Sequence, residues 1–206
     1  MLHHVEPVAL AQSVAEGEAP EILDRIGSPG CAVAVWQRQH GAEFQQWIDG
    51  LSPNQLPEAR LVLRPDRVED AMVSLCADCG MDESSNRRLL TGDIAALAAL
   101  FAQVMGAETV QLRLDVVSDN ACRKFHLDNV PARLLCTYRG RGTEYGEARR
   151  GEEPRIIHEL ATGSVGLFRG RLWPTEQSGI VHRSPPISGL GETRLLLVLD
   201  PVTGAI

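Results

Sequence analysis

The spacing of apolar residues divides the chain into two parts. In the first hundred residues, apolar positions recur at the three- to four-residue spacing of amphipathic helices, interrupted by two short apolar runs typical of strands. This pattern predicts helices over 20–26, 43–51, 68–79 and 94–105, and strands over 31–36 and 60–63. Thr91 or Asp93 can cap the last of these helices, which stops at Gly106 as a glycine C-cap would end it.

From residue 108 onward the pattern changes to short strands separated by turns rich in glycine and proline. We expect strands within 110–117, 124–138, 156–160, 164–168, 179–182 and 194–199, with 140–154 as a mobile loop. Many short strands favour a β-sandwich or barrel. The sequence therefore predicts an α+β fold in one domain, residues 1–206, with a mixed helical and strand portion (1–107) and a β-rich core (108–206).

Composition narrows the class of protein. The net charge of −7 argues against general nucleic-acid binding, although residues 123–183 hold 11 basic and 7 acidic residues and are the positive part of the chain. No apolar run reaches the roughly 20 residues that span a bilayer, and the N-terminal residues lack the pattern of a secretory signal. We therefore expect a cytoplasmic protein without a membrane partner.

The five cysteines are odd in number and scattered, so they do not form the pattern of a disulfide framework. Cys76 and Cys79 have the spacing of a metal or redox pair. A structural zinc site needs four ligands, and the chain offers no obvious second pair. We interpret these two residues as structural thiols and keep zinc binding as the alternative.

Three residues in the second half have the chemistry of a metal site. His126 and Asp128 are two residues apart, a spacing that puts both side chains on one side of a strand, and His182 follows in the segment 181–186. Two imidazoles and one carboxylate form the facial triad of non-haem Fe(II) sites, which leaves positions open for other ligands. Arg194, twelve residues after His182, could bind a carboxylate through two hydrogen bonds.

The segments around these residues resemble the Fe(II)/2-oxoglutarate-dependent oxygenases over about residues 110–200. Four stretches occur in the order found in that superfamily: 126–128, 134–145, 162–168 and 182–195. The whole chain is also similar to an uncharacterised bacterial family of about 200 residues. This resemblance implies a core that is a double-stranded β-helix (a jelly roll of the cupin type), with the N-terminal α/β portion packed on it.

The resemblance also implies roles for individual residues. His126, Asp128 and His182 would bind Fe(II), and Arg194 would hold the distal carboxylate of 2-oxoglutarate, with a hydrogen bond from Tyr138. The activity implied is hydroxylation or demethylation of an unknown substrate, coupled to conversion of 2-oxoglutarate to succinate and CO₂. Many relatives carry a serine or threonine two residues after the arginine, where this chain has Leu196.

Other interpretations of these residues stay open. The same triad could hold zinc or another divalent ion in a non-catalytic, metal-handling jelly roll, an alternative that Leu196 and the Cys76/Cys79 pair keep in view. His126 and Asp128 could also be a buried hydrogen-bonded pair, and Arg194 an exposed strand end. His158 alternates with apolar residues and is expected to be a structural or surface histidine.

Overall fold

The computed structural model describes residues 10–148 and 151–202. Its largest element is a seven-stranded sheet with the order β2-β3-β9-β6-β12-β5-β4, in which β2 and β3 are parallel and the other neighbouring strands are antiparallel. In chain order the strands of this sheet are β2 (Ser13–Gly17), β3 (Cys31–Trp36), β4 (Ala59–Leu63), β5 (Thr109–Val117), β6 (Ala132–Arg139), β9 (Val165–Arg169) and β12 (Arg194–Val202).

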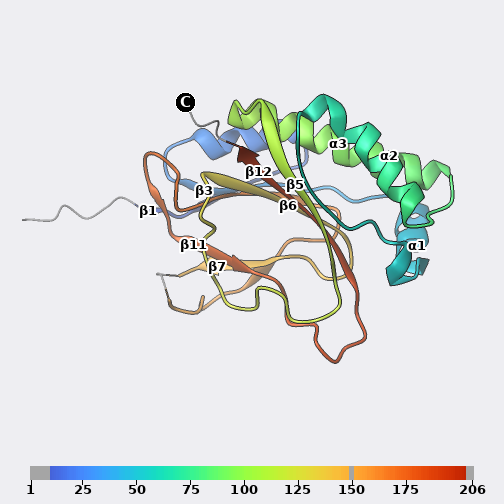
Figure 1. Cartoon of the computed structure of the whole chain (residues 1–206). Helices are drawn as coiled ribbons and strands as arrows, with labels where there is room; N and C mark the ends of the chain where they lie inside the picture. Colours follow the sequence, from blue (N-terminus) through green and yellow to red (C-terminus); the bar gives the residue numbers. More distant parts are fainter. Residues whose placement is uncertain (1–9, 149–150, 203–206) are drawn as a thin grey trace, which may run out of the picture.

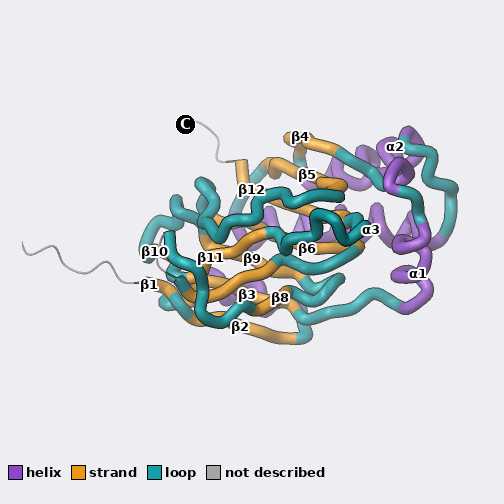
Figure 2. Tube along the Cα trace, turned by 90° about the horizontal axis from the view of Figure 1, so that it is seen from below, coloured by secondary structure: helices purple, strands orange, loops and turns teal. Residues whose placement is uncertain are grey.

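A three-stranded antiparallel sheet lies on one side of the large sheet (Figure 1). It has the order β11-β7-β8 and consists of β7 (Glu144–Glu147), β8 (His158–Glu159) and β11 (Ile180–Arg183). Two further short strands, β1 (Leu10–Ala11) and β10 (Gln177–Ser178), pair in parallel at the end of the molecule away from α1 and α2 (Figure 2). The chain therefore has the mixed α+β class that its sequence predicts.

The helices cover the other side of the large sheet (Figure 1). Among them α3 is the longest, and its buried side chains recur at helical spacing, so one face of the helix packs on the sheet. By length and composition alone α3 could cross a membrane, but packing on the sheet accounts for its apolar face in this structure. The helices are η1 (Pro20–Gly27), α1 (Ala42–Gly50), η2 (Pro53–Gln55), η3 (Pro65–Arg67), α2 (Val68–Asp78) and α3 (Ser85–Met105).

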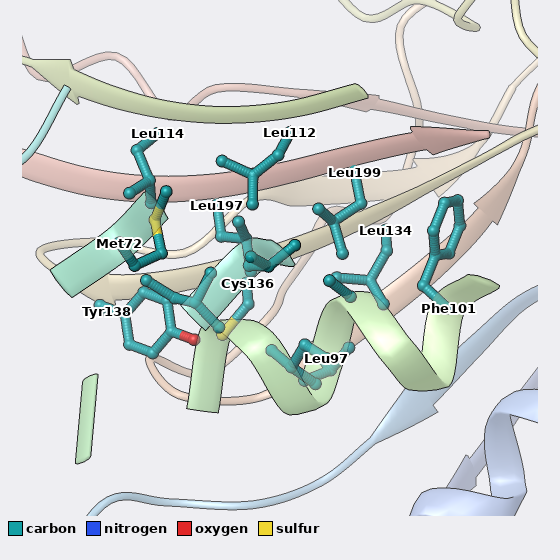
Figure 3. Packing of buried hydrophobic residues seen from close by; sticks show 14 of the residues in the cluster. Met72, Leu97, Phe101, Leu112, Leu114, Leu134, Cys136, Tyr138, Leu197 and Leu199 are labelled. Atoms are coloured by element: carbon teal, nitrogen blue, oxygen red, sulfur yellow. The ribbon is translucent and has the colours of Figure 1, made fainter. Parts of the chain in front are cut away.

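Two apolar clusters hold these layers together. The larger cluster joins the helices to the large sheet, where Leu97 and Phe101 of α3 pack near Leu134, Leu197 and Leu199 (Figure 3). The smaller cluster lies on the opposite face of the large sheet and includes side chains of both sheets, among them Leu135, Leu196 and Val198 from β6 and β12, and Tyr145 and Ile180 from β7 and β11. We call the face of the large sheet that carries the smaller cluster the inner face.

Most predicted elements occur within one or two residues of their expected limits, with informative exceptions. The helix expected from residue 94 begins at Ser85, because Ser84 accepts a hydrogen bond from the backbone N–H of Arg87 and is its N-cap. Thr91 and Asp93 lie inside the helix, so the predicted caps were wrong. Gly106 does end it, with a φ of 62°.

Two predictions in the second half also need correction. The expected loop 140–154 contains β7, since residues 144–147 pair with β11; residues 149 and 150 lie outside the described residues. His126 and Asp128 are not on a regular strand. His126 instead forms an isolated antiparallel bridge with His182, and Asp128 lies in the irregular segment before β6.

Candidate metal centre

Backbone hydrogen bonds bring His126 and His182 together from segments far apart in sequence. The N–H of each residue donates to the carbonyl oxygen of the other, at 3.0 and 3.1 Å. His182 is on β11, which is held by its pairing with β7. The two imidazole rings consequently lie side by side, with their centroids 4.8 Å apart.

A second backbone contact fixes Asp128. The N–H groups of Arg171 and Leu172 donate to the carbonyl oxygens of Asp128 and Val130, at 2.8 and 3.2 Å. This approach is close enough that a Cβ at Gly170 would collide with the Val130 carbonyl oxygen. A glycine at position 170 thus lets the segment after β9 hold Asp128 in place.

The three side chains converge on one point. One potential ligand atom from each of His126, Asp128 and His182 lies within 4.8 Å of the other two. Asp128 Oδ2 is 3.0 Å from His182 Nε2, and Asp128 Oδ1 is 3.6 Å from His126 Nε2. Asp128 and His182 are buried, whereas the His126 side chain is 30% exposed. The cluster therefore has one side near solvent.

The proton on the His126 ring and the hydrogen bonding of Asp128 suit a divalent cation at this point. Nδ1 of His126 is 2.9 Å from the Lys124 carbonyl oxygen, which can only accept, so Nδ1 carries a proton and Nε2 is the nitrogen that could bind a cation. Asp128 Oδ2 is buried and has no hydrogen-bond partner in the part of the chain that the structure describes. A buried carboxylate oxygen without a donor is costly, and a bound cation would satisfy it.

Electrostatics favours an ionised Asp128 and a neutral His182. Burial opposes ionisation of Asp128, yet the adjacent rings of His126 and His182 and the nearby charge of Arg133 hold the pKa of its carboxyl well below the usual range. Burial lowers the pKa of His182, against the pull of Asp128. The adjacent Asp128 carboxylate raises the pKa of the more exposed His126. Asp128 is thus an anion and His182 a neutral imidazole at pH 7.

Arg194 is fully buried at the start of β12 and has no carboxylate partner among the described residues. Its Nε donates to the Arg141 carbonyl oxygen at 2.6 Å, its Nη2 lies 3.5 Å from Thr137 Oγ1, and its Nη1 has no partner. Burial lowers its pKa to about 10. A buried guanidinium with an unused N–H group is set up to bind an anion.

The structure does not bring Arg194 into contact with the triad. On the inner face of β12, Leu196 and Val198 lie between Arg194 and Asp200. Asp200 is near the triad, because Arg133 contacts both Asp200 and Asp128. A ligand that touched both the triad and Arg194 would have to reach along this face.

The predicted role of Tyr138 was wrong. Successive side chains of a strand point to opposite faces, and Tyr138 shares the helix-covered face with Leu134 and Cys136 (Figure 3). Its hydroxyl donates to Asp93 Oδ2 of α3 at 2.6 Å. Tyr138 is therefore part of the core beneath the helices and is not on the face that carries Arg194.

Thr137 is the residue that the sequence interpretation missed. It pairs with Leu196 across β6 and β12, which puts its hydroxyl on the inner face beside Arg194. The resemblance leads one to expect a hydroxyl at position 196, where this chain has a leucine, and Thr137 supplies a hydroxyl from the neighbouring strand. Side chains at 133, 135 and 137 share one face of a strand, so this spacing could have identified Thr137. It would also have required knowing which face of β6 is the inner one.

The remaining candidates do not join the site. All five cysteines are free; Cys76 is buried, and the Cys79 thiol donates to the Gln55 carbonyl oxygen at 3.2 Å, in keeping with structural thiols. His158 is exposed on β8 and stacks on Tyr145. Three surface cavities of about 640, 600 and 820 Å³ occur elsewhere, and none of these three is lined by a triad residue.

The fold is shared with solved dioxygenases. The dioxygenase for auxin oxidation 1 of Arabidopsis thaliana, solved as a complex with 2-oxoglutarate, aligns with a TM-score of 0.53 and 12% sequence identity over 94% of this chain and 93% of that one. The dioxygenase for auxin oxidation of rice aligns with a TM-score of 0.54 and 12% identity, over 94% and 84%. At this low identity the likeness shows a dioxygenase-type fold and nothing finer.

The chain belongs to the family described as protein of unknown function (DUF1826), whose model matches residues 17–200. This match fits the prediction of an uncharacterised family of about this length. A comparison with curated proteins gives no match.

Proposed function

We propose that this protein is an Fe(II)- and 2-oxoglutarate-dependent oxygenase that hydroxylates or demethylates a substrate still to be identified. One observation carries the proposal: two imidazoles and a carboxylate converge with an unpartnered, buried carboxylate oxygen among them. This is the donor set of the facial triad, which leaves one side of Fe(II) open. The dioxygenase-type fold supports the same class.

The order of the strands supports a double-stranded β-helix core. In the large sheet β9, β6, β12 and β5 are neighbours, and in the small sheet β8, β7 and β11 are neighbours, with His126 adding a bridge to the free edge of β11. From β5 the chain passes to the His126 bridge beside the small sheet and back to β6, then across to β7 and β8 and back to β9. Apart from the short β10, it then crosses to β11 and returns to β12, as in a jelly roll. We also propose a single domain, because the larger apolar cluster joins residues from both halves of the chain.

Each residue has a defined task in this proposal. His126, Asp128 and His182 would hold Fe(II), which when bound supplies the oxidative chemistry. Arg194 would bind the distal carboxylate of 2-oxoglutarate through its free Nη1, and Thr137 would hydrogen-bond the same carboxylate. The apolar side chains between Arg194 and the triad would exclude water from the co-substrate.

Metal content and co-substrate binding test the proposal separately. His126→Ala and Asp128→Ala should each weaken Fe(II) binding by more than about 100-fold, because loss of a direct ligand exceeds the effect of losing a supporting contact. Arg194→Met should retain Fe(II) and lose 2-oxoglutarate. Anaerobic loading followed by metal analysis and calorimetry with 2-oxoglutarate measures both, with the exposed His158→Ala as the control histidine variant.

The enzymatic part has its own measurement. Wild-type protein with Fe(II), ascorbate and O₂ should slowly convert 2-oxoglutarate to succinate without added substrate. Unchanged metal content in both triad variants would refute the metal centre. Tight binding of zinc or iron together with no succinate would instead favour the non-catalytic, metal-handling alternative.

A further inference from the structure

Arg133 links the candidate metal centre to a second buried carboxylate. Its Nε and Nη2 donate to the two oxygens of Asp200, each at 2.7 Å, and its Nη1 donates to Asp128 Oδ1. Asp128 and Asp200 are both buried, and the Arg133 side chain is only 16% exposed. One guanidinium thus hydrogen-bonds both to a candidate metal ligand and to a second carboxylate outside the triad.

The strand register makes this link rigid. Leu134 of β6 pairs with Leu199 of β12, so Arg133 and Asp200 follow at the next position of adjacent strands. A planar guanidinium that makes two parallel hydrogen bonds to one carboxylate is fixed in orientation. Its remaining N–H group therefore points in one direction, toward Asp128.

The contact with Arg133 makes the two carboxylate oxygens of Asp128 inequivalent. Oδ1 accepts from Arg133, whereas Oδ2 lies 3.0 Å from His182 Nε2 and has no hydrogen-bond partner. One positive and two negative groups leave the trio with a net charge of −1, so a bound cation still meets a negative site. A cation would meet one free carboxylate oxygen rather than two.

We infer that Arg133, anchored by Asp200, is a positioning residue that limits Asp128 to binding the metal through one oxygen. This inference rests on the proposed metal centre and adds a determinant of its coordination number. A carboxylate that bound through both oxygens would take one of the positions that the facial triad leaves open. Arg133 therefore keeps that position available for a small molecule.

The experiment uses Mn(II) alone as the probe and counts the water molecules bound to it through the relaxation rate of solvent protons. In Arg133→Met/Asp200→Leu both charges are removed together, so Asp200 is not left as an unpaired buried charge. The variant should still bind Mn(II), but Asp128 should take a second position. Water relaxation per bound Mn(II) should then fall by about a third, from three open positions to two.

A second variant guards against failure of the first to fold. Arg133→Lys keeps a positive charge beside Asp200 but has no planar fork with which to serve both carboxylates, so it should also lose a metal-bound water. The matched control is Arg38→Met/Asp93→Leu, which removes another Arg–Asp pair with two hydrogen bonds, at 2.5 and 2.8 Å, from the helix-covered side of the sheet. Its relaxation per Mn(II) should equal that of wild type.

The outcomes separate this inference from the proposed function. Normal relaxation per bound Mn(II) in both Arg133 variants would overturn the positioning role while leaving the metal centre intact. Failure of wild-type protein to bind Mn(II) would instead count against the metal centre itself. A fall in relaxation in the control as large as in the Arg133 variants would also overturn the role, because any loss of a buried pair would then produce it.

Discussion

Two fully buried arginines differ in how completely their hydrogen bonds are satisfied. Arg169 donates to the carbonyl oxygens of Ile26 and Ser28 and to the Glu176 carboxylate, at 2.7 to 3.0 Å. Within residues 10–148 and 151–202, Arg194 has no carboxylate partner, and its Nη1 has no hydrogen-bond partner. A satisfied guanidinium ties structural segments together, whereas an incomplete one marks a place for a ligand.

This difference predicts opposite effects on stability. Arg169→Met should lower the free energy of unfolding by about 3 kcal/mol, because it breaks several hydrogen bonds to backbone carbonyl oxygens in the protein interior. Arg194→Met should leave the free energy unchanged or raise it, because it removes a buried charge that has no carboxylate partner. Urea unfolding of the protein without ligands measures both values. A larger loss for Arg194→Met than for Arg169→Met would contradict the assignment of Arg194 to a ligand.

A second residue-scale prediction concerns acid stability. Burial opposes ionisation of Asp93, but hydrogen bonds from Arg38 and Tyr138 hold the pKa of its carboxyl below the ordinary value. A depressed folded-state pKa contributes stability above the unfolded-state pKa of about 3.9 and loses it as the pH falls through the folded-state pKa. Asp93→Asn should therefore cost about 2 kcal/mol at pH 7.

The pH dependence of this cost is the critical measurement. The difference between wild type and Asp93→Asn should be constant from neutral pH to about pH 5 and should shrink below about pH 4. The exposed Asp66, whose pair with Arg64 is at the surface, gives the control variant Asp66→Asn, with no measurable cost. A difference that stays constant down to pH 3 would exclude the ionised Asp93 as its source.

At the scale of elements, the sequence predicted which segments are helices and strands better than where they begin. Apolar spacing reports the buried face of α3 but is silent about the first turn, where Asn86, Arg87 and Arg88 lie. The sequence pattern did not reveal the N-cap at Ser84, because polar residues occupy both the segment before the helix and its first turn. Similarly, short strands such as β8 and β10 depend on a partner distant in sequence, which no local pattern reveals.

The interior of α3 offers a test of packing at the element scale. Gly92 is a helical residue, and apart from its chain neighbours and the backbone of its own helix no atom lies within 4 Å of the position that a Cβ would occupy. Gly92→Ala should raise the free energy of unfolding by about 0.5–1 kcal/mol, because alanine loses less backbone entropy than glycine in a helix. Thermal unfolding measures the gain.

The glycine that ends the same helix is the contrasting control. Gly106 has a φ of 62°, and a substituted side chain there would be strained even though space is open around it. Gly106→Ala should therefore destabilise the protein by about 1 kcal/mol. Equal effects of the two substitutions would show that backbone conformation is not their cause.

At the scale of the whole molecule, the triad was predictable and its surroundings were not. The chemistry of His126, Asp128 and His182 is visible in their residue types and spacing, and the structure brings these three together. Their convergence depends on the bridge between His126 and His182 and on the contact between 170–172 and Asp128, both of which join distant segments. The register of β6 and β12 decides on which face of the sheet the side chains of Tyr138, Thr137 and Arg133 lie, and the sequence leaves this register open.

Because the three candidate ligands come from segments more than fifty residues apart, a bound metal would cross-link the small sheet to the start of β6. Any ligand that binds only the folded state stabilises it by mass action, by about 2.7 kcal/mol at a concentration 100 times its Kd. Mn(II) should raise the unfolding temperature of wild-type protein in proportion to the logarithm of its concentration, and a chelator should reverse the rise. Asp128→Ala should abolish it, whereas His158→Ala, on the exposed strand β8, should retain it. A rise of equal size in wild type and Asp128→Ala would mean that the metal stabilises the fold from another site.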